Sequence, residues 1–292
     1  MNSQRFFDQT LDMIQRGRLH AALPMLAGQL YNAQANPATW PETRAALHKH
    51  DLHRLLLQDP FSAHSANRPR GYPGDAGLID LIYDMQPLGE VSDLGREIFD
   101  VTIQFQAPEG VRQRRLHAET VVADAWQQGQ RILVLAGGHF READALIGND
   151  LSAITLVDQD PLSLDRVRAK HGEAITLIEA NVFHYLRRAV KAGQQFDLIY
   201  TLGLTDYLDT RSMQLLHKLM KSCLAPQGTM LLANFVPGHL GAGWMDAVMD
   251  WHLIYREEAE LEQYAAEIGM TPKTWRDPTG SVVWCEMASA AA

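Results

Sequence analysis

The stretch from Arg131 to Leu146, RILVLAGGHFREADAL, carries the pattern that decides the fold. A short apolar run ends in two glycines, and the residues after them are typical of a helix. A strand, a glycine turn and a helix in this order present backbone N–H groups to nucleotide-like ligands in α/β proteins. The spacing G-x-G-x-x-G is absent, because His139 and Phe140 stand where small residues are expected. The stretch therefore predicts a ligand-binding turn but does not identify the ligand.

Predicted strands and helices alternate in the chain that follows this turn. Continuous apolar strands separated by helices indicate a parallel sheet covered on both faces. The last segments, TPKTWRDP and SVVWCEMA, are joined by a short Asp-Pro-Thr-Gly turn and predict an antiparallel hairpin. After the first strand, the apolar runs predict strands over 153–160, 174–180, 196–204 and 228–236.

The first 128 residues are predicted to be helical. Phe7, Leu11 and Ile14 fall on one helical face, and further helices are expected over 41–57, 78–85 and from 94 to about 127. The segment RPRGYPGDAG, residues 68–77, interrupts them with two prolines and three glycines. We therefore expect a helical region over 1–128 and an α/β domain over 129–292.

Composition narrows the class of protein. The 292 residues are 46% hydrophobic and 21% charged, as in ordinary globular proteins, and the net charge is −9. This charge argues against a nucleic-acid or anionic-membrane binder. The start lacks an apolar signal region and no apolar run reaches the roughly 20 residues of a membrane helix, so a cytoplasmic protein is expected.

Several kinds of site have no matching pattern in the sequence. The two cysteines, Cys223 and Cys285, cannot build a disulfide framework or a cysteine zinc cluster. The twelve histidines form no H-E-x-x-H pattern, so no metal is expected. A G-x-S-x-G elbow and a P-loop are also absent, which argues against ordinary hydrolases and NTPases.

These residues resemble the class I S-adenosylmethionine (SAM)-dependent methyltransferases from residue 131 to the end. The resemblance implies a Rossmann-like, mostly parallel sheet with one reversed C-terminal strand, preceded here by a helical N-terminal extension. A narrower resemblance covers nearly the whole chain and is to the bacterial extracellular-factor (3-hydroxypalmitate methyl ester biosynthesis) family. It rests on RPRGYPGDAGLIDLIYDM, VRQRRLHAE, VDQDPLSL, FDLIYTLGLTDYL and DWHLIYREEAEL. Where such proteins more often read A-C-G-P-x-R-E, this chain keeps Ala136, Gly138, Arg141 and Glu142.

The resemblance implies SAM as the cofactor and assigns residues to its parts. The acidic residue at the end of the second strand would bind the ribose hydroxyls, and the chemistry of Asp158 agrees, because a carboxylate ending an apolar strand has no packing role. Asp160 and Asn181 also have the pattern of helix N-caps. The implied cofactor residues are Ala136, Gly137 and Gly138 for the methionine part, Asp158 and Gln159 for the ribose, Asn181 and Val182 for the adenine, and Thr201, Leu202 and Tyr207 near the methyl group.

The acceptor side is less determined by the sequence. His139, Asp206 and Tyr72 are the candidates for a general base, if the acceptor needs one. The motif PRGYPGD is interpreted either as a lid over the cofactor or as an ordered turn before the next helix. Asp197 precedes its strand, at the wrong edge of the sheet, and is interpreted as structural. The candidate substrate-binding residues are Arg70, Tyr72, Arg114, Arg115 and Tyr255, with solvated helix charges as the alternative for the arginine pair.

The function expected from these observations is methyl transfer to a small molecule. The acceptor would be a carboxyl, hydroxyl or amine group, in keeping with a bacterial secondary or signalling metabolite and natural-product chemistry. A nicotinamide-dependent oxidoreductase and a non-catalytic SAM-binding protein remain as alternatives. No nucleic-acid or membrane partner is expected, and a homodimer is left open.

Overall fold

A computed structural model describes residues 3–87 and 89–289 of the chain. These residues form two compact units. The first contains residues 1–112 together with 238–253, and the second contains 113–237 together with 254–292. The boundary expected at 128/129 marks the start of strand–helix alternation, whereas the contacts divide the chain inside the preceding helix, α8 (Gln106–Gln127). The chain thus leaves the second unit after residue 237 and rejoins it at 254.

The described residues up to Arg112 are mostly helical, as predicted. The expected helix over 41–57 is two helices, because His50 caps a new one: its Nδ1 accepts a hydrogen bond from the backbone N–H of Leu52 at 3.0 Å. The expected helix from 94 to 127 is likewise divided, into α7 and α8. The helices before α8 are α1 (Ser3–Gln15), α2 (Leu19–Gln34), α3 (Trp40–His48), α4 (Asp51–Leu56), α5 (Pro60–Asn67), α6 (Ala76–Asp84) and α7 (Asp93–Thr102).

A buried carboxyl group ties two of these helices together. Asp59 caps α5, and its Oδ1 accepts from the N–H of Phe61 at 2.9 Å. Its Oδ2 accepts from the hydroxyl of Ser62 at 2.7 Å and from that of Thr102, on α7, at 2.9 Å. Burial raises the pKa of Asp59 to about 6, against the effect of these hydrogen bonds.

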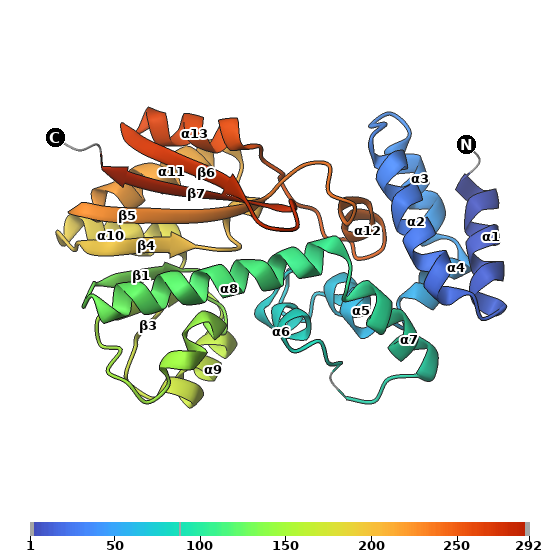
Figure 1. Ribbon diagram of the computed structural model, residues 1–292, viewed down its shortest axis with the longest axis horizontal. Helices are drawn as coiled ribbons and strands as arrows, with labels where there is room; N and C mark the ends of the chain where they lie inside the picture. The colour runs from blue at the N-terminus through green and yellow to red at the C-terminus, as the bar shows by residue number, and fades with distance from the viewer. Residues whose placement is uncertain (1–2, 88, 290–292) are drawn as a thin grey trace. The chain divides into compact units, whose positions relative to one another are not determined.

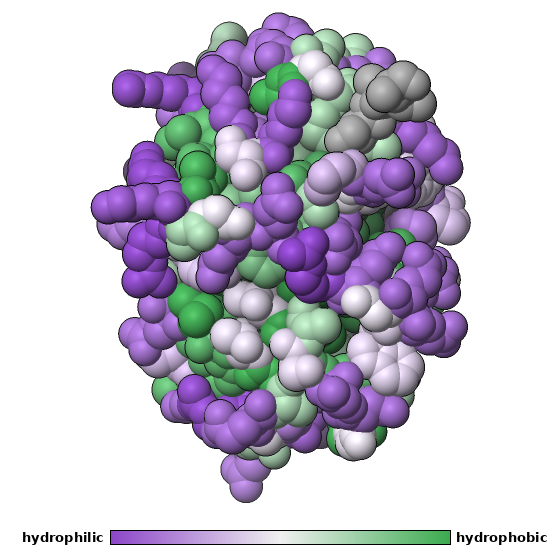
Figure 2. All heavy atoms as spheres, turned by 90° about the vertical axis from the view of Figure 1, so that its left-hand side faces the viewer, coloured by the Kyte–Doolittle hydropathy of each residue, from purple (hydrophilic) through white to green (hydrophobic). Residues whose placement is uncertain are grey.

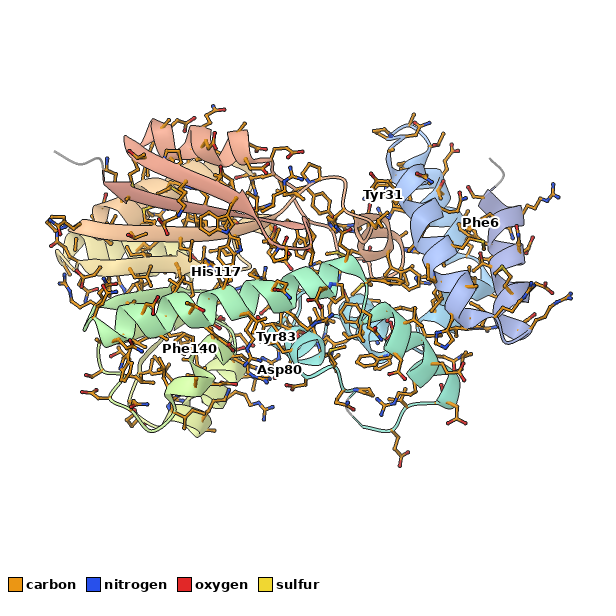
Figure 3. The ribbon with its side chains drawn as sticks, viewed as in Figure 1. Phe6, Tyr31, Asp80, Tyr83, His117 and Phe140 are labelled. Atoms are coloured by element: carbon orange, nitrogen blue, oxygen red, sulfur yellow. The ribbon has the colours of Figure 1, made fainter. Side chains whose placement is uncertain are left out.

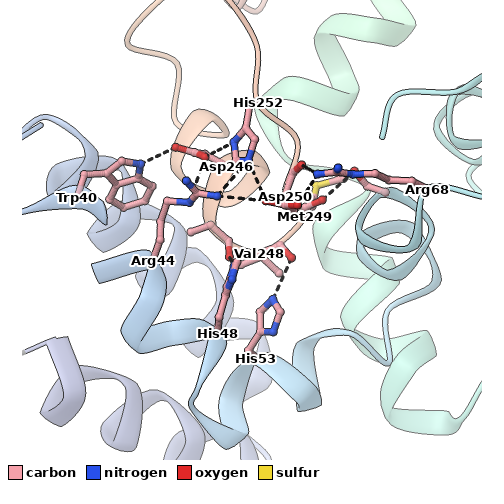
Figure 4. A network of polar contacts seen from close by, with 12 residues as sticks. Trp40, Arg44, His48, His53, Arg68, Asp246, Val248, Met249, Asp250 and His252 are labelled. Atoms are coloured by element: carbon pink, nitrogen blue, oxygen red, sulfur yellow. Dashed lines mark hydrogen bonds and ion pairs between the residues drawn. The ribbon is translucent and has the colours of Figure 1, made fainter. Parts of the chain in front are cut away.

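Residues 238–253 complete the first unit from a distant part of the sequence, which the sequence pattern did not indicate. They contain α12 (Ala242–Ala247), and polar contacts hold the end of this segment (Figure 4). Asp246 accepts from the indole N–H of Trp40 at 2.5 Å, and Asp250 accepts from Arg44 at 3.1 Å. The four carbonyls of residues 247–250 each accept a side-chain hydrogen bond, from His48, His53, Ser65 and Arg68 in turn.

The second unit contains the predicted sheet. Its seven strands lie in the order β3-β2-β1-β4-β5-β7-β6, and β7 runs antiparallel to both of its neighbours while β1 to β5 are parallel. The expectation of a mostly parallel sheet with a reversed C-terminal strand is therefore confirmed. The strands are β1 (Ile132–Leu135), β2 (Ile154–Asp158), β3 (Thr176–Glu179), β4 (Phe196–Thr201), β5 (Leu224–Phe235), β6 (Met270–Arg276) and β7 (Val282–Ser289).

Helices cover both faces of this sheet (Figure 1). On one face, Leu133 and Leu135 of β1 belong to a buried apolar cluster with α10 (Val182–Lys191), α11 (Thr210–Ser222) and α13 (Glu258–Glu267). On the other face lie α9 (Pro161–His171) and the second half of α8, whose His117 packs 4.6 Å from Trp284 of β7 between ring centroids (Figure 3). Because strand side chains alternate between faces, each central strand contributes to both layers of core.

The helix expected directly after the glycine turn is instead a 3₁₀ helix, η1 (Arg141–Leu146). Phe140 has the left-handed backbone conformation, with φ of 49°, so a regular α-helix cannot begin before Arg141. The first closing bond is of the short i→i+3 kind, from the N–H of Ala143 to the carbonyl of Phe140 at 3.3 Å. The left-handed Gly148, with φ of 87°, follows the end of this short helix.

The surface is mixed in character. The face shown in Figure 2 combines hydrophilic side chains with small hydrophobic areas. Over residues 3–87 and 89–289, none of the helices is both long enough and apolar enough to cross a bilayer.

Gly243 of α12 allows a prediction about how the returning segment packs. A Cβ there would lie 2.6 Å from the backbone carbon of Leu30 in α2, where a side chain cannot fit. Gly243→Ala should lower the free energy of unfolding by about 1–3 kcal/mol through overpacking. Gly28→Ala, on α2 with open space around its Cβ, is the matched control and should be neutral or stabilising by up to about 1 kcal/mol. Urea denaturation measures both, and equal effects of the two substitutions would contradict the close packing.

Candidate functional site

The candidate site lies at the carboxyl edge of the parallel strands. β1 pairs with β2 on one side and with β4 on the other, so the direction of strand order reverses between β1 and β4. Open α/β sheets bind ligands in the crevice at such a switch point. Asp197, near the opposite end of β4, pairs with Arg131 at 3.0 Å, which confirms its structural interpretation.

The turn after β1 has an unusual backbone. Ala136, Gly138 and Phe140 all have positive φ, of 54°, 53° and 49°. A Cβ on Gly137 would lie 2.8 Å from the side chain of Leu156, so a larger residue there would force neighbouring side chains under the turn to shift. Gly138 has the left-handed backbone conformation, which favours glycine. Two of the three positive φ values therefore belong to residues with side chains.

Asp158 joins the end of β2 to this turn. Its Oδ2 accepts from the N–H of Gly138 at 2.8 Å, and its Oδ1 accepts from the N–H of Asp160 at 2.9 Å. Burial raises the pKa of Asp158, while these two N–H groups oppose the rise by stabilising the carboxylate. Each carboxylate oxygen has further lone pairs, so Asp158 can hold the turn and still accept hydrogen bonds from a diol.

The cap assignments made from the sequence are confirmed. Asp160 caps α9, accepting from the N–H of Leu162 at 3.0 Å. Asn181 caps α10, accepting from the N–H of Phe183 at 3.0 Å. The side chain of Val182 is buried in the core at the start of α10, whereas Gln159 and Asn181 are exposed at the strand ends.

A second layer of buried polar groups lies beneath the turn. His139 is only 6% exposed, so its side chain does not lie on the surface of the turn. Glu142 is also buried, and its Oε1 accepts from the hydroxyl of Tyr200, on β4, at 2.8 Å. Burial raises the pKa of Glu142, and the nearby charges of Arg114 and Arg115 oppose the rise. The sequence motif contained Glu142, but nothing in it indicated the bond to Tyr200.

The two adjacent arginines of α8 have different surroundings. Arg115 forms ion pairs with Glu119 at 2.6 Å and with Asp144 at 3.7 Å, near the surface. Arg114 is 5% exposed. Helical periodicity explains the difference, because Arg114 falls in a buried stripe with Ala107, Val111, Ala118, Val122 and Ala125. That stripe is visible in the sequence and could have separated the two arginines.

Arg114 points at the end of β4. Its Nη1 donates to the carbonyl of Leu202 at 2.7 Å, and its guanidinium lies 3.8 Å from where a Cβ of Gly203 would be. Its Nε and the hydroxyl of Thr201 are buried without a hydrogen-bond partner within the described part of the chain. Buried polar atoms are normally paired, so these two are exceptions among the described residues.

Asp206 follows β4 in the short helix η2 (Thr205–Tyr207) and is 2% exposed. Its Oδ1 accepts from the N–H of Phe235, at the end of β5, at 2.7 Å. Its backbone carbonyl accepts from the N–H of Ile254 at 2.7 Å. Burial raises the pKa of Asp206 to about 6, against the lowering effect of the Phe235 N–H and of the charges of Arg114 and Arg256.

The remaining candidates lie in different parts of the fold. Tyr207 is exposed beside Asp206, and Tyr255 is half-buried in the segment that rejoins the sheet unit. Arg70 and Tyr72 belong to the helical unit, in the loop before α6. That loop ends at Asp75, which caps α6 and accepts from His64 at 2.8 Å. The loop is thus an ordered turn introducing the next helix, and its role as a lid stays a prediction.

Metal ligands do not gather in the described ranges. Residues 3–87 and 89–289 contain no group of three or more histidine, cysteine, aspartate or glutamate side chains placed to hold a metal ion.

Comparisons with known proteins identify the fold. No family model and no curated protein matches the chain. Among solved structures, a possible exported protein from Bordetella parapertussis is similar, with 20% identity over 93% of this chain and 96% of that one, and a TM-score of 0.59. Magnesium protoporphyrin IX methyltransferase from Synechocystis, solved with S-adenosylhomocysteine, is 14% identical over 82% of this chain and 100% of its own, with a TM-score of 0.50. The chain therefore has the Rossmann-like fold of class I methyltransferases, as predicted.

Because burial raises the pKa of Asp206, the free energy of unfolding should depend on pH. The folded chain binds this proton more tightly than the unfolded chain, because its pKa rises from 3.8 to about 6. The contribution of Asp206 to the free energy of unfolding therefore falls as pH rises through that interval. The free energy of unfolding of Asp206→Asn, taken relative to that of the wild type, should rise by up to about 3 kcal/mol between pH 4 and pH 7.5. Urea denaturation at both pH values measures the difference, and a difference independent of pH would contradict the buried state of this carboxyl.

Proposed function

We propose that the chain is a SAM-dependent methyltransferase that acts on a small molecule with a carboxyl, hydroxyl or amine acceptor. The observation that carries this proposal is the anchored turn: Asp158 holds the N–H of Gly138 at the switch point of the sheet. The resemblance of the sequence to the extracellular-factor family supports a bacterial secondary or signalling metabolite as the acceptor.

The edge of the sheet offers one group for each part of the cofactor. The turn at Gly138 would receive the methionine part, and Asp158 the ribose hydroxyls through its remaining lone pairs. Ala136, Gly137, Gln159, Asn181, Val182, Thr201, Leu202 and Tyr207 would complete the cofactor site. The strands that carry these residues are adjacent in the order β3-β2-β1-β4, which supports a single elongated ligand.

The antiparallel β7 favours this function over a nicotinamide-dependent oxidoreductase. In the dinucleotide-binding fold the classic order is 3-2-1-4-5-6 without an inserted reversed strand. Here β7 lies between β5 and β6. A SAM-binding protein without transfer activity would have the same fold, so the acceptor side must decide between binding and catalysis.

Methyl transfer from a sulfonium needs alignment more than acid–base chemistry. Holding nucleophile, methyl and sulfur in line can supply about 7–11 kcal/mol of the barrier. A base is required only for a protonated nucleophile. Asp206 supports that role best, since its pKa of about 6 keeps it ionised at neutral pH and near the range of an efficient base. His139 and Tyr72 remain the other candidates.

Arg114 supports recognition of a carboxylate. Its guanidinium is buried at the end of β4 with an unpaired Nε, so an anion there would receive a charge-assisted hydrogen bond. The carboxylate belongs either to the methionine part of SAM or to the acceptor. Arg115 is engaged by Glu119, and it is therefore a weaker candidate than Arg114. Arg70, Tyr72 and Tyr255 would bind the acceptor.

Calorimetric titration with S-adenosylhomocysteine and with NAD⁺ tests the cofactor. S-adenosylhomocysteine should bind and NAD⁺ should not. Asp158→Ala should weaken the binding by roughly 10-fold to 150-fold, from the loss of hydrogen bonds to a charged group. Asp165→Ala, an exposed carboxylate on α9, is the control and should bind normally. Binding of NAD⁺ alone would replace this proposal with the oxidoreductase.

The same titration with a shortened ligand tests Arg114. Arg114→Met should weaken the binding of S-adenosylhomocysteine by about 10-fold or more. The binding of methylthioadenosine, which lacks the amino-acid group, should not change. Arg115→Met should change neither. If Arg114→Met leaves both ligands unchanged, Arg114 does not contact the cofactor, and its anion must be sought in the acceptor.

A further inference from the structure

A buried arginine holds both ends of the turn that carries Asp206. Arg256 is 1% exposed, and its Nη1 donates to the carbonyl of Thr205 at 2.8 Å. Its Nη2 donates to the carbonyl of Leu208. These two carbonyls bracket η2, so one planar guanidinium fixes the loop that follows β4. From the sequence alone, Arg256 is open to interpretation as a solvated charge or as a substrate-binding residue.

Arg256 also fixes the loop to the neighbouring strand. Its backbone N–H donates to the carbonyl of Phe235 at 3.0 Å, and its Nη1 lies 3.1 Å from Oδ1 of Asn234. Asn234 in turn donates to the carbonyl of Ile254 at 3.0 Å. Phe235 is the residue whose N–H binds the carboxylate of Asp206. The network therefore closes on itself around Asp206, through β5 and the segment 254–256.

The charges around this network come from several elements. Asp206 is influenced by two buried guanidinium groups, that of Arg256 and that of Arg114 on α8. Arg256 itself is 3.5 Å from Glu260 of α13, a partly exposed carboxylate. Its charge also acts on Asp209, before α11, and on His217 within α11. Both arginines favour the ionised form of Asp206, and burial opposes it.

We infer that Arg256 is a positioning residue, which holds the turn after β4 so that Asp206 faces the acceptor side of the crevice. This inference rests on the proposed function, because only a transfer reaction gives Asp206 an acceptor to meet. Arg256 acts through the backbone carbonyls of the turn and through its charge, with no bond to the Asp206 carboxylate. It should therefore affect the rate and pH dependence of transfer more than the binding of the cofactor.

Arg256→Gln removes the positive charge. Arg256→Lys keeps the charge but removes the planar guanidinium that donates to two carbonyls. In both variants S-adenosylhomocysteine should bind within about 3-fold of the wild type, a small change on the scale of one hydrogen bond. Arg256→Gln should move the acid limb of the transfer–pH profile upward by at least about one unit, because the ionised form of Asp206 loses a nearby positive charge. Arg256→Lys keeps the charge, so its rate should fall without that shift. Arg276→Gln, a surface arginine paired with Glu258, is the control and should change neither.

A measurement without transfer separates this inference from the proposed function. The stability difference between Asp206→Asn and its parent is measured against pH in the wild-type and Arg256→Gln backgrounds. The pH at which this difference is half complete should be higher in the Arg256→Gln background than in the wild type. If S-adenosylhomocysteine does not bind at all, the proposed function fails while this cycle still reports on Arg256. An unmoved midpoint overturns the inference even if the ligand binds.

A third measurement covers the case in which neither Arg256 variant folds. Carbon NMR of the wild-type carboxyls should show Asp206 titrating well above the usual value of about 3.9 for aspartate. A midpoint near that usual value would mean that burial does not outweigh the two guanidinium charges, and would overturn the pH dependence that the inference expects of transfer.

Discussion

The carboxylate of Asp158 fixes the backbone from which the candidate site is built. It accepts a hydrogen bond from the N–H of Gly138, after β1, and another from the N–H of Asp160, after its own strand β2. The turn after β1 contains two non-glycine residues with positive φ, a conformation that costs free energy unless its surroundings hold it. The hydrogen bond from Gly138 supplies part of that support. The same group therefore stabilises the turn, and the proposed function also assigns it the diol of the cofactor.

A second constraint acts on the other side of the switch point. Arg114 and Arg256 are about 140 positions apart in the sequence, and both lie buried near the loop after β4. Removing one partner from a buried charge network is costly, because the remaining charge is left without compensation. Asp206 balances these cations while burial raises its pKa to about 6. Charges held in this way are oriented before any ligand arrives.

Sequence patterns were sufficient where a local rule governs the structure. Apolar runs gave the five parallel strands and the terminal hairpin, since burial on both faces leaves little room for polar residues. Asp160 and Asn181 were recognisable as caps because capping depends on neighbouring residues alone. The helix expected after the turn exists but is of the 3₁₀ kind, and nothing in the residue type of Phe140 indicates the left-handed backbone that precedes it.

Contacts between residues far apart in the chain could not be predicted from the sequence. The return of residues 238–253 to the helical unit depends on the fit of Gly243 against Leu30, about 210 positions away. The role of Arg256 depends likewise on carbonyls some 50 residues earlier, which no residue pattern encodes. The assignment of Arg114 was within reach, since the apolar stripe of α8 places it on the buried face. The cofactor and acceptor roles of the site residues stay predictions.

A crystal structure of the protein grown with S-adenosylhomocysteine would test whether Asp158 holds the turn and the cofactor at the same time. We predict that both ribose hydroxyls bind the carboxylate of Asp158 while the N–H of Gly138 keeps its bond to Oδ2. The amino-acid end should then lie between the turn at Gly138 and the carbonyl of Leu202. A ligand bound elsewhere, or an Asp158 side chain that must leave Gly138 to admit it, would contradict the dual role assigned to this carboxylate.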